Sequence, residues 1–289
     1  MLVMKNNRGR LVAFIASIVI AGLLSSCGSL TNYYQSEAAP DHVKAGKKDF
    51  RVVFTNVVGP VTSRVFRNAR LPNGNLRIAD GLREHLKQTL QPLDVVLVRS
   101  KPALSRFGIP GHFLHSTIWL GTDEQMKQLG ATGLLTSRAS RTNLDHNETI
   151  VEASAGDVHL VDLDDFIDTD EILIMRPAPM STSQKRKKYA HINQLLGTKF
   201  DTSFDLSDES RLTCIEVIAL VFPEFNLPAR YSSGRFTLIP DDLAHLAVSK
   251  NKILRVIEHI VYVPERKFAV QGRKEVSLLL SHPKEKRNR

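Results

Sequence analysis

Residues 213–222 read Thr213-Cys214-Ile215-Glu216-Val217-Ile218-Ala219-Leu220-Val221-Phe222, an apolar run with the period of a helix. Val217, Ile218 and Val221 follow Cys214 by three, four and seven positions, so they share one side of that helix. This pattern predicts a helix over residues 210–222 that packs on a sheet and places the thiol in its first turn. Free amides and the helix dipole at that end favour a thiolate, although a free cysteine is commonly only a small buried hydrophobe.

The chain has only two cysteines, and the other one, Cys27, follows an apolar segment at the N-terminus. Residues 1–10 are basic, and the 14 residues from Leu11 to Leu24 are too short to span a bilayer. The next residues, Leu24-Ser25-Ser26-Cys27-Gly28, resemble the lipobox of bacterial lipoproteins. The resemblance implies cleavage before Cys27 and attachment of lipid to its sulfur, which leaves Cys214 without a disulfide partner.

The composition predicts a globular domain between a polar tether and a basic C-terminal tail. Apolar residues make up 42% of the chain and charged residues 24%, both ordinary for a globular protein. We expect a signal peptide at residues 1–26, a lipidated tether at 27–49 and one folded domain at 50–265. The informative motifs of that domain lie at 90–223. Residues 266–289 are expected to form a basic C-terminal tail, which either contacts anionic lipid or is simply solvated.

The exported location has consequences for partners. The tethered protein is expected to sit in the bacterial cell envelope, and Gly28 after the lipidated cysteine favours the outer membrane, facing the periplasm. Nucleic acid is not expected as a partner, because export separates the protein from it and no basic motif interleaved with aromatics is present. The sequence leaves the oligomeric state open.

Strand patterns dominate the middle of the chain and helix patterns follow them. Strands are predicted at residues 51–58, 93–99, 113–121, 149–153, 157–161 and 171–175, with a hairpin turn at 154–156. Helices are predicted at 81–90, 184–196 and 210–222, the last capped by Asp208 or Ser210 and stopped by Pro223. Strands first and helices second indicate an α+β domain with an antiparallel sheet.

His115 and Glu152 lie on two of these predicted strands. In the strand at 113–121, Leu114, Ile118 and Leu120 share the expected core face, so His115 points the other way, with Thr117 and Trp119. A histidine on the less apolar face is available for chemistry. Taken alone, however, such a histidine usually has only a structural role.

The order of several motifs resembles a known family. The segments are Leu93-Asp94-Val95-Val96-Leu97-Val98, Pro110-Gly111-His112-Phe113-Leu114-His115-Ser116-Thr117-Ile118-Trp119-Leu120-Gly121, Ile150-Val151-Glu152-Ala153, Asp162-Leu163-Asp164-Asp165-Phe166, Ile172-Leu173-Ile174-Met175-Arg176-Pro177, and Cys214 with Glu216. Together they resemble the circularly permuted, NlpC-type papain-fold hydrolases, in particular the YiiX-like group. Leu93 and Ile215 depart from that group, which has Gly and a small polar residue there.

The resemblance implies a cysteine hydrolase of permuted papain-like fold. Cys214 would be the nucleophile, His115 its base and Glu152 the carboxylate that orients the ring, while amides at the start of the helix would bind the oxyanion. No cofactor and no metal are implied. Residues 122–148, between the strands of His115 and Glu152, are either a substrate lid or an inert surface insertion.

Three functions remain open at this point. The first is a peptidase or amidase that cleaves the stem peptides of the cell wall through a thioester. The second is a lipid amidase, lipase or acyltransferase, because the permuted scaffold is similar to that of lecithin–retinol acyltransferases. The third is an envelope scaffold without turnover.

Overall fold

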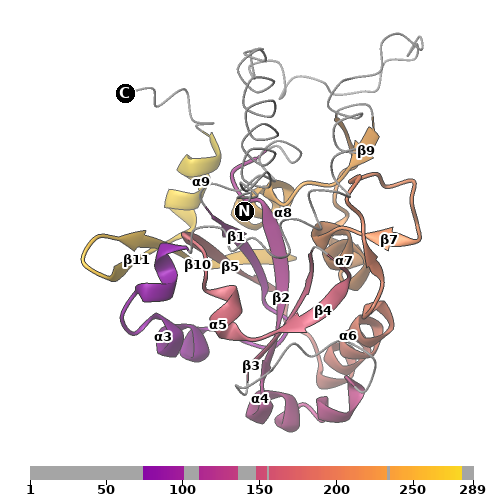
Figure 1. Cartoon of the computed structure of the whole chain (residues 1–289), viewed down its shortest axis with the longest axis horizontal. Coiled ribbons are helices and arrows are strands. Elements are labelled where there is room, and N and C mark those ends of the chain that lie inside the picture. Colours follow the sequence, from indigo (N-terminus) through magenta and orange to yellow (C-terminus); the bar gives the residue numbers. More distant parts are fainter. Residues whose placement is uncertain (1–73, 101–110, 136–147, 155, 233–234, 282–289) are drawn as a thin grey trace, which may run out of the picture. The chain divides into compact units, whose positions relative to one another are not determined.

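The computed structural model describes residues 74–100, 111–135, 148–154, 156–232 and 235–281. These residues build a seven-stranded sheet in the order β11-β10-β5-β1-β2-β3-β4 (Figure 1). Every neighbouring pair in this sheet is antiparallel. The α+β class with an antiparallel sheet, expected from the sequence, is confirmed.

The strands of the sheet are β1 (Val95–Arg99), β2 (His115–Thr122), β3 (Glu148–Ala153), β4 (Val158–Val161), β5 (Glu171–Pro177), β10 (Leu254–Val263) and β11 (Lys267–Gln271). Two small two-stranded sheets pair β6 (Lys199–Phe200) with β7 (Arg211–Leu212) and β8 (Arg230–Ser232) with β9 (Arg235–Thr237). The helices are η2 (Asn75–Ile78), α3 (Leu82–Thr89), α4 (Asp123–Gln128), η4 (Thr132–Leu134), α5 (Leu163–Phe166), α6 (Thr182–Leu195), α7 (Cys214–Val221), η5 (Pro223–Phe225), α8 (Asp241–Val248) and α9 (Arg273–Ser281).

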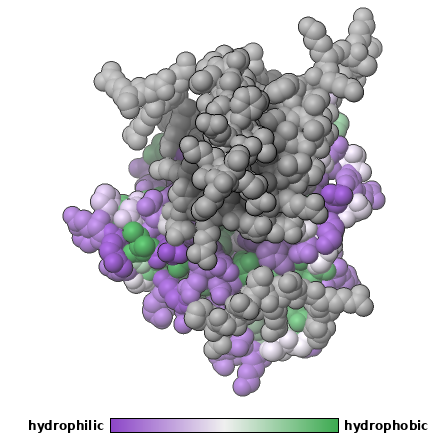
Figure 2. Space-filling view, in the orientation of Figure 1, coloured by the Kyte–Doolittle hydropathy of each residue, from purple (hydrophilic) through white to green (hydrophobic). Residues whose placement is uncertain are grey.

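Apolar side chains cover both faces of the sheet. One core, called the main core below, joins alternate strand residues, such as Leu97 and Ile118, to helices α4, α6, α7, α8 and α9. The other joins the intervening residues, such as Val96 and Trp119, to η2, α3 and α5. In the view of Figure 2, the coloured residues are mostly hydrophilic.

One sequence-based expectation about the faces of β2 was therefore wrong. Thr117 and Trp119, predicted on the less apolar face, are 1% and 0% exposed because η2, α3 and α5 pack over that face. His115 differs from them because it is the first residue of the strand, and its side chain is 27% exposed to solvent. Accessibility of the histidine comes from its position at the strand end, not from an open face.

Helix α7 begins at Cys214, four residues later than predicted. Arg211 and Leu212 instead form the short strand β7, and Thr213 is the N-cap in place of Asp208 or Ser210. The Thr213 hydroxyl accepts a hydrogen bond from the amide of Glu216, whose carboxylate accepts one from the Thr213 amide at 2.8 Å. This capping box fixes the start of the helix at the cysteine.

The C-terminal boundary of the domain also differs from the prediction. Residues 267–281, expected as part of a basic tail, form β11 and α9. Strand β11 pairs with β10, and Val276 and Leu280 of α9 are buried in the main core. The domain thus extends at least to residue 281, because this segment carries apolar side chains that close one end of the core.

Some predictions fall outside the described residues: the strand at 51–58, the signal peptide, Cys27 and the tether, residues 136–147 of the insertion, and residues 282–289. The start of that insertion forms α4. Within the described part of the chain, no helix is long and apolar enough to cross a membrane.

Candidate active site

The thiol of Cys214 lies where the start of α7 meets the beginning of β2. Helix α7 packs against β2 and β3, and Cys214 is 3% exposed in the main core. The Cys214 thiol and the His115 imidazole interact electrostatically, and each shifts the pKa of the other. Two residues that are 99 positions apart in the sequence are therefore neighbours in the fold.

The imidazole of His115 also binds the carboxylate of Glu152. Its Nε2 lies 3.0 Å from Glu152 Oε2. Because a carboxylate only accepts hydrogen bonds, this contact assigns a proton to Nε2. Glu152 is opposite Thr117 in the β2–β3 register, and His115 lies two positions before Thr117 in β2. The Glu152 carboxylate is therefore a diagonal cross-strand neighbour of His115. The structure thus brings together all three residues that the sequence singled out.

The electrostatics of the three groups favour an ion pair. Burial by itself would lower the pKa of His115, but the Cys214 thiolate and the Glu152 carboxylate outweigh it and raise the pKa to about 10. Burial likewise opposes ionisation of the thiol, yet His115 and Ser116 hold the pKa of Cys214 below its ordinary value. Both shifts favour the form with a thiolate on Cys214 and an imidazolium on His115.

The carboxylate of Glu152 stays ionised in this setting. Burial would raise the pKa of Glu152, but hydrogen bonds from His115 and His159 hold it well below its usual range. A charged carboxylate in turn stabilises the imidazolium form of His115.

Two residues of the site were not singled out from the sequence. Ser116 helps to lower the pKa of Cys214, and its buried hydroxyl makes no hydrogen bond among the described residues. His159 of β4 approaches Glu152 from the side opposite His115, with 3.3 Å between His159 Nε2 and Glu152 Oε1. The predicted hairpin at 154–156 indicated that β3 and β4 are neighbours, but the register that pairs Glu152 with His159 is seen only in the structure.

His112, the other histidine of the Pro-Gly motif, belongs to a separate cluster. Its Nε2 lies 2.6 Å from Glu171 Oε2, and Arg99 Nη1 lies 2.9 Å from Glu171 Oε1. His259 Nε2 is 3.4 Å from the same Glu171 Oε2. Among the described residues, no group of three His, Cys, Asp or Glu side chains converges as a metal site requires.

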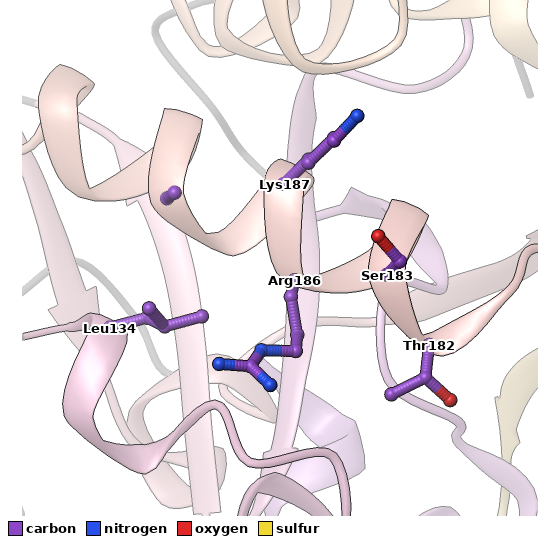
Figure 3. A pocket seen from close by; sticks show the side chains of 6 residues that line it. Leu134, Thr182, Ser183, Arg186 and Lys187 are labelled. Atoms are coloured by element: carbon purple, nitrogen blue, oxygen red, sulfur yellow. The ribbon is translucent and has the colours of Figure 1, made fainter.

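A surface cavity of about 350 Å³ lies elsewhere, between α6 and η4. Its lining consists of Leu134, Thr182, Ser183, Arg186, Lys187 and Ala190. Arg186 reaches toward Leu134, whereas Lys187 points away from it (Figure 3). None of the three candidate catalytic residues lines this cavity.

A buried cysteine at the start of a helix, a histidine beside it and a carboxylate behind the imidazole ring are the arrangement typical of cysteine hydrolases. The chain belongs to the family described as permuted papain-like amidase enzyme, YaeF/YiiX, C92 family, whose sequence model matches residues 89–264. This family consists of cysteine peptidases and amidases, so the protein is a cysteine hydrolase of that type.

A comparison with solved structures also gives a match. It is described as the crystal structure of metalloprotein yiiX from Escherichia coli O157:H7, and it shares 16% sequence identity with a TM-score of 0.36. The match covers 64% of this chain and 97% of the other. A comparison with curated protein sequences gives no significant match.

Proposed function

We propose that this protein is a lipid-anchored amidase of the cell envelope that cleaves peptide bonds in cell-wall stem peptides, with Cys214, His115 and Glu152 as its catalytic residues. The observation that carries the proposal is the position of the His115 imidazole, which lies 3.0 Å from the Glu152 carboxylate and interacts electrostatically with Cys214. The family supports an amide substrate. The export segment and the lipobox-like Cys27 support an envelope address.

The proposed reaction begins with attack of the Cys214 thiolate on the acyl carbonyl. The His115 imidazolium then gives its proton to the departing amine, which leaves a thioester on Cys214. Water, deprotonated by the now neutral His115, attacks the thioester, which releases the acid and restores the thiolate and the imidazolium. Glu152 keeps the ring oriented and stabilises its charged form throughout.

The start of α7 offers a site for the oxyanion. Amides in the first turn of a helix have no acceptor within the helix, and the Thr213 hydroxyl is directed to Glu216. The amide of Cys214 therefore remains a suitable donor for the negative oxygen that forms as the carbonyl is attacked.

Product analysis tests the substrate class. The purified full-length protein, its Cys214→Ala variant and a His85→Gln control are incubated with isolated cell wall and, separately, with membrane lipid extract. His85 pairs with Glu258 at 2.7 Å, away from the three proposed catalytic residues, so this control removes a similar histidine–glutamate pair. We expect the wild-type and control proteins to release peptide fragments from cell wall and the Cys214→Ala variant to release none.

Other outcomes point elsewhere. Fatty acids released from the lipid extract, without peptides, would replace the proposal by a lipid hydrolase. A thiol-reactive amide or ester probe that never labels Cys214 would favour a scaffold without turnover.

The anchor is tested separately. Cells grown with labelled palmitate should incorporate it into the wild-type protein and not into a Cys27→Ser variant. Density-gradient separation of membranes then shows whether the labelled protein follows the outer membrane, as Gly28 leads us to propose.

A further inference from the structure

The carboxylate of Glu152 lies between two imidazoles that come from neighbouring strands. Oε2 faces His115 Nε2 at 3.0 Å, and Oε1 faces His159 Nε2 at 3.3 Å. His159 is directly opposite Glu152 in the β3–β4 register. The carboxylate is therefore held from both sides, and only one of its two partners is in contact with the nucleophile.

The surroundings of His159 favour its charged form. Its Nδ1 lies 2.8 Å from the carbonyl oxygen of Asp157, which can only accept a hydrogen bond. Its Nε2 faces an ionised carboxylate, which also only accepts. Both ring nitrogens must then carry protons for both contacts to be favourable, so the geometry selects the imidazolium.

Charge balance supports the same state. The proposed resting site contains a thiolate at Cys214, an imidazolium at His115 and a carboxylate at Glu152, which sum to one negative charge. A positively charged His159 brings this largely buried group to neutrality. Clusters of buried charge are tolerated when they are paired and hydrogen-bonded in this way.

We propose that His159 is a positioning residue that, as an imidazolium, fixes the carboxylate of Glu152 toward His115 and neutralises the charged site. This inference rests on the proposed catalytic role of Cys214 and His115. His159 acts only through Glu152.

Other charged groups near His159 do not change this assignment. Asp157 Oδ1 is 3.7 Å from His159 Nδ1 and also 3.6 Å, through Oδ2, from Lys199 of β6. Asp165 of α5 interacts electrostatically with Glu152. The hydrogen bond to Glu152 is the main cause that raises the pKa of His159 above its ordinary value, with further support from Asp157.

The proposal gives a definite sign for a pH profile. Removal of a positive charge makes each neighbouring group hold its proton more tightly, so its pKa rises. In a His159→Gln variant, which keeps a hydrogen-bond donor but loses the charge, the midpoint for formation of the Cys214 thiolate should move to higher pH. A role limited to packing or to a neutral hydrogen bond would leave that midpoint in place.

The experiment measures alkylation of Cys214 by iodoacetamide against pH in the full-length protein. Mass spectrometry of the derived peptides separates Cys214 from Cys27. We expect the wild-type midpoint to lie below that of a free thiol, about 8.5, and the His159→Gln midpoint to lie roughly half a unit to one unit above the wild-type value. His85→Gln, the matched control, should keep the wild-type midpoint.

The outcomes separate this inference from the proposed function. A wild-type midpoint equal to that of a free thiol contradicts the thiolate–imidazolium pair and hence the proposed function. A low wild-type midpoint that His159→Gln does not move overturns the inference alone.

A second measurement covers the case in which His159→Gln does not fold. Nitrogen NMR of the wild-type imidazoles should find both ring nitrogens of His159 protonated at pH 7. A neutral His159 ring at that pH overturns the inference.

Discussion

Replacement of Glu152 by Gln tests the electrostatic coupling of the site most directly. The substitution keeps the size of the side chain but removes the negative charge 3.0 Å from His115 Nε2. Loss of that charge disfavours the imidazolium, so the pKa of His115 must fall. The shift is opposite in sign to the one expected from His159→Gln.

The size of the shift follows from the strength of the contact. A hydrogen bond to a charged group contributes about 1.5–3 kcal/mol, and one pKa unit corresponds to about 1.4 kcal/mol. The pKa of His115, raised to about 10 in the wild-type protein, should therefore fall by about one to two units. The thiolate of Cys214 continues to support the charged ring, which is why the pKa does not return fully to its ordinary value.

The consequence for catalysis is a narrower pH range. Under the proposed mechanism, activity needs a thiolate and a protonated His115 together, so the upper limit of the range is the pKa of His115. Glu152→Gln lowers that limit. In a substrate-independent assay, an NMR titration of the His115 ring reports the same pKa directly.

Glu258→Gln provides the matched control, because it removes the same charge from the pair with His85. This variant should leave the titration of His115 unchanged. The reasoning is refuted if His115 of the wild-type protein titrates near its ordinary value of 6.5, or if Glu152→Gln and Glu258→Gln give the same titration.

The other predictions concern stability. Glu171→Gln removes a charge bound by Arg99 and His112 and should lower the free energy of unfolding by about 3 kcal/mol at pH 7, as measured by urea denaturation. Interactions with His112, His259 and Arg99 outweigh burial and hold the pKa of Glu171 below its usual range. The charge of Glu171 therefore stabilises the fold above pH 4.5 and stabilises it less as the pH falls. The difference in stability between variant and wild type should shrink in acid, and a constant difference would contradict this prediction. Thr213→Val removes the cap of α7 and should cost about 1 kcal/mol in the same assay, whereas Thr213→Ser should cost much less; equal losses would refute the capping role. Tyr189→Phe leaves the buried carbonyl of Leu120 without the hydroxyl that donates to it and should lower the free energy of unfolding by about 1–2 kcal/mol, while unchanged stability would show that this hydrogen bond contributes nothing.

Local patterns in the sequence were sufficient for the main elements. Strand patterns predicted the segments that became β1 to β5, and helical periodicity predicted α3, α6 and α7. The true start of α7 was also encoded, because Thr213 and Glu216 have the spacing of a capping box. These features depend on neighbours within a few positions, which is why they can be read without a structure.

Only part of the candidate active site could be predicted from the sequence. Order and residue type singled out Cys214, His115 and Glu152, and strand β4 was predicted. The contact of His159 with Glu152 required the register of β3 against β4, and the approach of Ser116 to the thiol required the packing of α7 on β2. Neither is set by spacing along the chain, since register and packing join residues from separate elements.

The C-terminal segment shows most clearly how the sequence-based expectation and the tertiary structure differ. From residue 265 to residue 289 the chain has eight Lys or Arg against three Glu, which suggested a solvated tail. Tertiary structure instead pairs β11 with β10 and buries Val276 and Leu280 of α9. The sequence by itself determined where helices and strands can form and which side chains are reactive; only the tertiary structure decided which of them are buried and which meet, because burial and long-range hydrogen bonds depend on partners far away in the chain.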